Sequence, residues 1–306
     1  MELYKKHRPY LLKHIQGQES AVKQLKGFFK ENTFPHAVLI TGPSGCGKTT
    51  LARIIKSKLD CSDDDFIEMN SADDRGVEAI RGIKTRWTMS MRGQGKCRIY
   101  FMDECHQLTK DAQTALLKSL EDQPSYVYFI LATTDGTKMI PTVKTRCTEI
   151  KLELLSNDDL QHTLAYVLER ENVQISQDVI DRIIDVAEGS ARKALVILDQ
   201  IALLETEEEQ IEAVQKSETR AQAIELARAL ISPRPVWKNI AKILKDLSDD
   251  PEGIRHLVLA YSKNVLLGGG KLSNRAYLLI NCFRDNFYDS KHAGLVAACW
   301  EATITK

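Results

Sequence analysis

The stretch that decides the fold is AVLITGPSGCGKT, residues 37–49. Its first five residues are apolar or β-branched and predict a buried strand, while the "TLARIIKSKL" that follows at 50–59 predicts a helix. Between the two, "GPSGCGKT" fits the pattern G-x-x-x-x-G-K-[ST]. A strand before this pattern and a helix after it are the context that a phosphate-binding loop needs.

The loop therefore predicts a nucleotide site. Its glycines let backbone N–H groups wrap phosphates, and the amino end of the next helix favours their negative charge. Lys48 is expected to reach the outer phosphates, and Thr49 to bind magnesium. Cys46 is interpreted as a small loop residue, with a redox role as the alternative. The residues of the loop expected at the nucleotide are Gly42, Pro43, Ser44, Gly45, Cys46, Gly47, Lys48, Thr49 and Thr50.

A second apolar run, "CRIYFMDECH" at 97–106, ends in two carboxylates. Asp103 is expected to hold magnesium through water, and Glu104 to polarise the attacking water. A strand that ends in an acidic turn by chance is the alternative. "DECH" also resembles the acidic motif of superfamily 2 helicases, but those proteins need a second sheet domain, and none is indicated after residue 155. His106 is therefore interpreted as a packing or hydrogen-bonding residue.

The order of elements predicts an α/β protein. Strands are expected at 37–41, 65–70, 97–103, 126–134 and 149–154, alternating with amphipathic helices, which is the pattern of a parallel sheet covered on both faces. From about residue 156 the apolar spacing is helical. We expect an α/β domain at 1–151, a small helical domain at 152–214 and a second helical domain at 215–306.

Composition narrows the class of protein. The 306 residues carry no formal net charge, but residues 1–150 hold 23 Lys and Arg against 18 Asp and Glu. This weakly basic half permits nucleic-acid contact without requiring it. The seven cysteines include no C-x-x-C pair, which argues against a disulfide framework or a zinc site and favours a reducing compartment. We expect a soluble protein with no signal peptide, because the amino terminus is polar.

Several motifs in order resemble the clamp-loader ATPases of the AAA+ class, both replication factor C small subunits and the bacterial gamma/tau subunit. The resemblance covers roughly residues 1–200. Besides the loop, the motifs are "YKKHRP" (4–9), "IQGQE" (15–19), "NSADDRGVEAIRGIK" (70–84), "DECHQLTKDAQTALLKSLEDQP" (103–124), "FILATTD" (129–135), "KTRC" (144–147) and "GSARKALVILDQ" (189–200). Two features of the bacterial subunit are missing: only Cys61 represents its four-cysteine zinc module, and the tau extension is not found.

The resemblance implies a RecA-like AAA+ domain, a helical lid and a helical collar, with ATP and Mg²⁺ as cofactors. Thr134 would be the sensor 1 residue beside Glu104, and Arg192 the sensor 2 residue, with an ordinary first-turn arginine as the alternative. Arg146, otherwise a lone surface arginine, would enter the ATP site of a neighbouring subunit. The residues implied on the adenine side are Tyr4, Arg8, Pro9, Ile15 and Gln18.

The resemblance also implies contacts with DNA and with a clamp. Arg75, Arg81 and Lys84 would contact phosphates, although a solvated helix face explains them too. Trp87, Met89 and Met91 would press into the clamp, although core packing is nearly as good an explanation. Ile80 and Ile83 share a helical face with Trp87 and are expected to be buried.

The implied function is that of a DNA-dependent ATPase at the replication fork, in the nucleoid or at a viral replication site within the cytoplasm. Its implied partners are a sliding clamp, primer-template DNA and other loader subunits, in a pentameric ring that includes copies of this chain. Two alternatives stay open. One is a non-hydrolysing stator subunit, and the other is a different AAA+ DNA motor, such as a branch-migration ATPase, which should carry a carboxyl-terminal winged helix.

Overall fold

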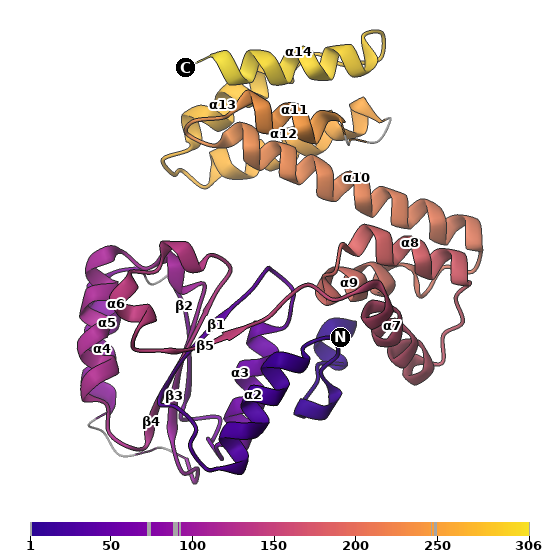
Figure 1. Ribbon diagram of the computed structural model, residues 1–306. Coiled ribbons are helices and arrows are strands. Elements are labelled where there is room, and N and C mark those ends of the chain that lie inside the picture. Colours follow the sequence, from indigo (N-terminus) through magenta and orange to yellow (C-terminus); the bar gives the residue numbers. More distant parts are fainter. Residues whose placement is uncertain are drawn as a thin grey trace. The chain divides into compact units, whose positions relative to one another are not determined.

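A computed structural model describes residues 2–71, 75–87, 91, 93–245, 247 and 250–305, and for 84–87 it describes the backbone alone (Figure 1). The chain forms two compact units, which divide between Leu203 and Leu204. None of the helices in the described ranges is long and apolar enough to cross a membrane.

The first unit is built on a parallel sheet of five strands. The strands are β1 (Ala37–Thr41), β2 (Phe66–Asn70), β3 (Arg98–Asp103), β4 (Val127–Thr133) and β5 (Thr148–Lys151), in the spatial order β2-β3-β4-β1-β5. Every neighbouring pair is parallel. All five expected strands are present. β5 ends at Lys151 and not at residue 154 as expected. The backbone N–H and carbonyl of Glu153 bond to the Gln18 side chain and not to a neighbouring strand.

Helices cover both faces of this sheet (Figure 1). α2 (Glu19–Lys30) and α3 (Lys48–Lys58) pack on one face through Leu25 and Ile55. α4 (Val77–Trp87) and α5 (Lys110–Asp122) pack on the other through Ile80, Ile83 and Leu116. Side chains alternate between the faces along each strand, so strands buried on both sides are apolar throughout, as β1 and β4 are. The α/β class is confirmed.

Short elements connect these layers. α1 (Leu3–Lys6) precedes a 3₁₀ turn at Leu12–His14, and further 3₁₀ turns follow β3 at Cys105–Gln107 and β4 at Gly136–Lys138. The short helix α6 (Pro141–Lys144) leads into β5.

Three helices complete the first unit: α7 (Asn157–Glu171), α8 (Gln177–Ala187) and α9 (Ala191–Ile201). Each begins at a serine whose hydroxyl accepts a hydrogen bond from a backbone N–H in the first turn, which explains why the helices start there. α9 packs on α1, so the end of this helical part meets the amino terminus.

The second unit is helical in all its described elements: α10 (Glu207–Ile231), α11 (Trp237–Lys245), α12 (Pro251–Leu267), α13 (Ser273–Cys282) and α14 (Lys291–Ile304). Leu230, Val258, Phe283 and Leu295 are fully buried in its core. α10 runs unbroken through residues 214 and 215, where we expected a domain boundary. The assignment of domains at 1–151, 152–214 and 215–306 stays a prediction.

Candidate nucleotide-binding site

The candidate site lies where β1, β3 and β4 end. β4 lies between β1 and β3, and its last residue, Thr133, is paired with Thr41 at the end of β1. Asp103 ends β3. Ligands of open parallel sheets bind beyond the carboxyl ends of the strands, where the order of strands reverses, so the phosphate-binding loop and the two carboxylates meet at the position expected for a ligand.

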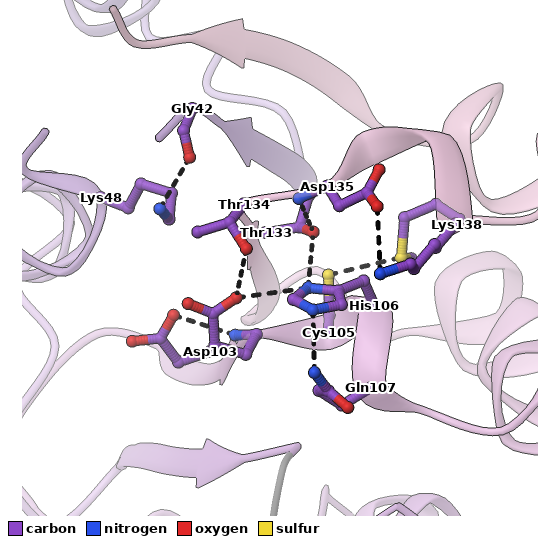
Figure 2. A network of polar contacts seen from close by, with 12 residues as sticks. Gly42, Lys48, Asp103, Cys105, His106, Gln107, Thr133, Thr134, Asp135 and Lys138 are labelled. Atoms are coloured by element: carbon purple, nitrogen blue, oxygen red, sulfur yellow. Dashed lines mark hydrogen bonds and ion pairs between the residues drawn. The ribbon is translucent and has the colours of Figure 1, made fainter. Parts of the chain in front are cut away.

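The loop has the backbone that a phosphate cradle needs. Gly45 has φ +80° and Gly47 has φ +105°, which is the left-handed region that favours glycine. A Cβ on Gly45 would lie 2.1 Å from the hydroxyl of Ser190, so a side chain there would displace the hydroxyl that caps α9. Lys48 is buried, and its ammonium donates a hydrogen bond of 2.8 Å to the carbonyl of Gly42 (Figure 2). A second bond of 2.8 Å goes to the carbonyl of Pro43. The carbonyls of the loop therefore hold the side chain of Lys48, the residue that the sequence predicts at the phosphates.

Oxygen ligands suited to magnesium lie beside this loop. The hydroxyl of Thr49 donates to Oδ2 of Asp103 over 3.1 Å, and Oδ1 of Asp103 accepts from the backbone of Glu104. A hydroxyl and a carboxylate, completed by phosphate oxygens and water, form the set that Mg²⁺ favours. The donor chemistry therefore fits Mg²⁺. Among the described residues there is no group of three His, Cys, Asp or Glu that could hold a metal on its own.

Glu104 is held in an unusual conformation. Its backbone is left-handed, with φ +50°, which is uncommon outside glycine and occurs disproportionately at functional sites. The hydroxyl of Thr134 donates to Oε2 of Glu104 over 3.0 Å, so the structure places these two residues together as the sequence predicted. His106 lies beside them and hydrogen-bonds with the hydroxyl of Thr133 over 3.1 Å (Figure 2).

A cavity of about 310 Å³ opens over the loop and reaches the amino-terminal segment and α7. It is lined by most of the residues that the sequence predicted at the nucleotide: Tyr4, Arg8, Pro9, Ile15, Gln18, Ser44, Gly45, Cys46, Gly47, Lys48, Thr49, Thr50, Asp103, Glu104 and Arg192. Gly42, Pro43, Thr134 and Arg146 are outside this lining. His7, Tyr166 and Arg170 also line it, and the sequence did not indicate them.

Positive charge is concentrated at this cavity. Burial lowers the pKa of Arg8, and the nearby charges of Arg53 and Arg192 lower it further. The Arg192 guanidinium lies 5.8 Å from the centre of the Tyr4 ring. Arg192 is in the first turn of α9, where the helix dipole disfavours a cation. An anionic ligand would offset the unfavourable electrostatic energy of Arg8 and Arg192, and the phosphates of a nucleotide are such a ligand.

Two lining residues have other structural roles. Burial raises the pKa of the Cys46 thiol, which keeps it protonated and supports the interpretation as a small packing residue. The Gln18 amide donates to the carbonyl of Glu153 over 2.8 Å and accepts from its N–H over 3.1 Å. Both ends of this amide are thus bonded to the segment between β5 and α7. A contact of Gln18 with the nucleotide would therefore involve the methylene groups of its side chain.

Arg146 is exposed and follows α6. Its guanidinium donates to Glu121 on α5 over 2.5 Å and to the carbonyl of Thr142 over 3.0 Å. The sequence did not indicate the buried Gln113, whose amide accepts from the N–H of Ile140 over 2.9 Å and ties α5 to the start of α6. Gln113 thus fixes the segment that carries Arg146, and the exposed Arg146 side chain is bonded within its own chain.

The residues predicted to contact DNA and the clamp lie on and after α4. Arg75 and Arg81 are exposed, and Arg81 forms an ion pair of 3.0 Å with Glu78. Ile80 and Ile83 are buried as expected, and Met91 is exposed.

Three further predicted residues cannot be placed in the same way. The side chains of Lys84 and Trp87, and the whole of Met89, lie outside the described residues. The roles of all these residues stay predictions.

The sequence resembles known proteins along its first two thirds. Residues 65–156 match the family described as "DNA polymerase III, delta subunit", and residues 13–76 match the "Sigma-54 interaction domain". "DNA polymerase III subunit gamma" of Buchnera aphidicola subsp. Schizaphis graminum is 34% identical over 64% of this chain and 60% of its own length. "Replication factor C small subunit" of Methanococcus maripaludis is 34% identical over 66% of this chain and 65% of its own length. "DNA polymerase III subunit gamma/tau" of Mycoplasma pneumoniae is 32% identical, over 32% of its length.

Solved structures resemble the fold. The "Thermotoga maritima RuvB Holliday junction branch migration motor" superposes with a TM-score of 0.57 at 22% identity, over 74% of this chain and 79% of that one. A second RuvB structure from the same organism, that of a point variant, gives 0.59 at 20% identity, over 83% of this chain and 90% of that one. At these identities the likeness concerns the fold alone.

The fold is the RecA-like fold of AAA+ ATPases, followed by helices. In sequence the chain is similar to subunits named DNA polymerase III gamma, gamma/tau and replication factor C small subunit, which confirms the resemblance seen in its motifs. The matched part spans from about one third to just under two thirds of these relatives.

Proposed function

We propose that this chain is an ATP-hydrolysing clamp-loader subunit, which opens a ring-shaped sliding clamp and loads it onto primed DNA during replication. The observation that carries the proposal is a complete set of ATPase residues in contact: Thr49 with Asp103, and Thr134 with Glu104. Relatives named gamma and replication factor C small subunits support the clamp-loading role.

Each residue of the site has a task in this chemistry. Lys48 exchanges its loop carbonyls for the outer phosphates, and Arg192 adds positive charge at the γ-phosphate. Mg²⁺, held by Thr49 and Asp103, supplies positive charge to the phosphate oxygens when bound with ATP. Glu104 orients the attacking water and accepts its proton, and Thr134 holds the Glu104 carboxylate.

Arg146 acts in a neighbouring subunit. It is outside the lining of its own cavity, on a segment tied to α5 by Gln113, and its exposed guanidinium would exchange Glu121 for the neighbour's phosphate. A guanidinium presents a rigid fork of donors on a permanent charge, which suits the charge that develops on a transferred phosphoryl group. Hydrolysis therefore requires an assembled ring, which the collar at 215–306 holds together with other subunits.

DNA and the clamp are contacted from the segment that follows β2. We name Arg75, Arg81 and Lys84 the DNA-contact set, since they supply sequence-independent phosphate contacts. Trp87, Met89 and Met91 supply the apolar contact with the clamp. The energy of ATP is used to change the shape of the ring and not for chemistry on DNA.

Two other functions remain to be distinguished. A stator subunit would not turn over ATP, and the complete catalytic set argues against it. A branch-migration motor is the other alternative, because the RuvB structures share the fold, and the DNA that stimulates the ATPase distinguishes it.

Affinity capture from the native source tests the proposal. Full-length chain with a tag, loaded with Mg²⁺ and a slowly hydrolysed ATP analogue, should recover a ring-shaped clamp and other AAA+ subunits. With ADP, or with Lys48→Ala, recovery of the clamp should fall. Recovery of AAA+ subunits without a clamp under every condition would contradict the proposal. An ATPase stimulated by four-way junctions and not by primed DNA would favour the branch-migration motor.

A further inference from the structure

The Glu104 carboxylate is contacted at one oxygen by two side chains. Thr134, which follows β4, donates to Oε2 over 3.0 Å. His106, in the turn after β3, places Nδ1 3.2 Å from the same oxygen. Among the described residues, none makes a hydrogen bond or ion pair with the other oxygen, Oε1. Thr134 and His106 come from different strand ends, so together they fix the direction of the carboxylate.

The surroundings of His106 define which ring nitrogen carries the hydrogen. The Gln107 amide nitrogen lies 3.0 Å from Nε2 of His106, and an amide NH₂ donates, so Nε2 accepts (Figure 2). A neutral imidazole that accepts at Nε2 carries its hydrogen on Nδ1. This Nδ1 hydrogen-bonds with the hydroxyl of Thr133 over 3.1 Å, and Oε2 of Glu104 lies 3.2 Å from the same nitrogen. The Thr133 oxygen also accepts from the N–H of Asp135. The ring is thus held from both sides.

We propose that His106 is a positioning residue for Glu104. Together with Thr134 it retains Oε2, which leaves Oε1 as the oxygen that meets the attacking water. The proposal rests on the ATP hydrolysis proposed above. The Glu104 side chain is 34% exposed, so packing alone does not fix it, whereas the His106 side chain is only 8% exposed. The positive end of the Nδ1–H dipole of this fixed ring thus lies beside the negatively charged Oε2 and attracts it.

Two substitutions separate positioning from packing. In His106→Asn, the side-chain amide nitrogen takes nearly the place of Nδ1 and can donate, but much of the ring's volume is lost. In His106→Leu the volume is largely kept and the donor is lost. His106 is outside the cavity lining, so neither change should alter the KM for ATP.

In the assembled protein we expect His106→Asn to retain kcat within about threefold, and His106→Leu to lose about tenfold or more, since small displacements of a catalytic group are costly. Thermal unfolding of each variant shows whether it is folded. A packing role predicts the reverse order, with Leu near wild type and Asn impaired. The reverse order, or equal rates in all three proteins, would overturn the proposal.

A second measurement does not depend on activity. Nitrogen NMR of histidine-labelled protein without nucleotide should show His106 protonated at Nδ1 and unprotonated at Nε2. The spectrum of His106→Asn assigns this signal among the seven histidines. Glu104→Gln should shift the Nδ1 resonance, while Glu121→Gln, distant in sequence and bonded to Arg146, should not.

A His106 ring protonated at Nε2, or an Nδ1 chemical shift that is unchanged in Glu104→Gln, would overturn the positioning role. A wild-type assembly that does not hydrolyse ATP would overturn the proposed function instead, and the NMR result would still decide whether His106 holds Glu104.

Discussion

Replacing Arg146 with Ala should abolish turnover without unfolding the protein. In the structure the guanidinium forms an ion pair with Glu121, and the two side chains are 37% and 48% exposed. Exposed pairs contribute at most about 1 kcal/mol to stability. An arginine that acts in a neighbour's site contributes about 10³-fold or more to turnover. At about 1.4 kcal/mol per tenfold, that is about 4 kcal/mol of transition-state stabilisation. The catalytic effect should therefore far exceed the effect on folding.

The assay compares three properties of the Arg146→Ala protein: ATP binding, assembly and turnover. Binding to its own loop and assembly should be near wild type, while turnover falls by about 10³-fold. Lys144→Ala is the matched control, because Lys144 is also exposed and cationic and lies on the adjoining helix α6. It should keep its turnover.

Mixing provides the test of action between subunits. Arg146→Ala and Lys48→Ala should each be inactive when assembled alone. In a mixed ring an intact loop from the first can lie beside an intact arginine from the second, so some activity should return. Two results would refute the reasoning: dilute monomer as active as the ring, or mixed rings that form without any rescue.

Three further changes test other parts of the structure. Glu104→Gln should keep Mg²⁺–ATP binding but lose at least about 10²-fold in hydrolysis, measured by phosphate release, and a rate near wild type would remove Glu104 from catalysis. Alanine at all three residues of the DNA-contact set should reduce the slope of DNA-stimulated ATPase activity against salt concentration by up to about three charges. The activity without DNA should be kept. An unchanged slope would mean that these residues are only a solvated surface. Asp65→Asn breaks a buried ion pair with Arg98 and should lower stability at pH 7 by about 3 kcal/mol in urea unfolding, whereas the exposed Asp64→Asn should not.

The pH dependence of stability follows from the same ion pair. Burial would raise the pKa of Asp65, but the Gly93 N–H and the Arg98 guanidinium outweigh it and hold that pKa below its usual value. A carboxylate with a lowered pKa in the folded state adds stability above its unfolded pKa of about 3.9. That stability is lost as the pH falls through the lower folded value. Between pH 5 and about pH 2 the wild type should therefore lose more stability than Asp65→Asn, by urea unfolding.

The strands and the loop were predictable from sequence because their signals are local. β1 is an unbroken apolar run, since a central parallel strand is buried on both faces, and its bounds were predicted to the residue. Thr49 and Asp103 were each predicted at magnesium from their own motifs, and they meet in the structure because the carboxyl ends of parallel strands share an edge.

The remaining contacts were not predictable because they join distant segments through single side chains. The Gln18 amide bonds to Glu153, and the Asp65 carboxylate bonds to Arg98. Neither pairing leaves a periodicity that a single sequence displays. Tyr166 reaches the cavity only because the helices after β5 fold back over the loop.

Transfer of a clamp onto DNA tests the central claim most directly. The complex captured from the native source is incubated with clamp, primed circular DNA and Mg²⁺–ATP, and the clamp that stays on DNA is measured by gel filtration. We predict that the clamp is retained with ATP, is released when the circle is cut, and is not loaded by a complex that carries Lys48→Ala. Equal retention without ATP, or equal loading by the Lys48→Ala complex, would contradict the account.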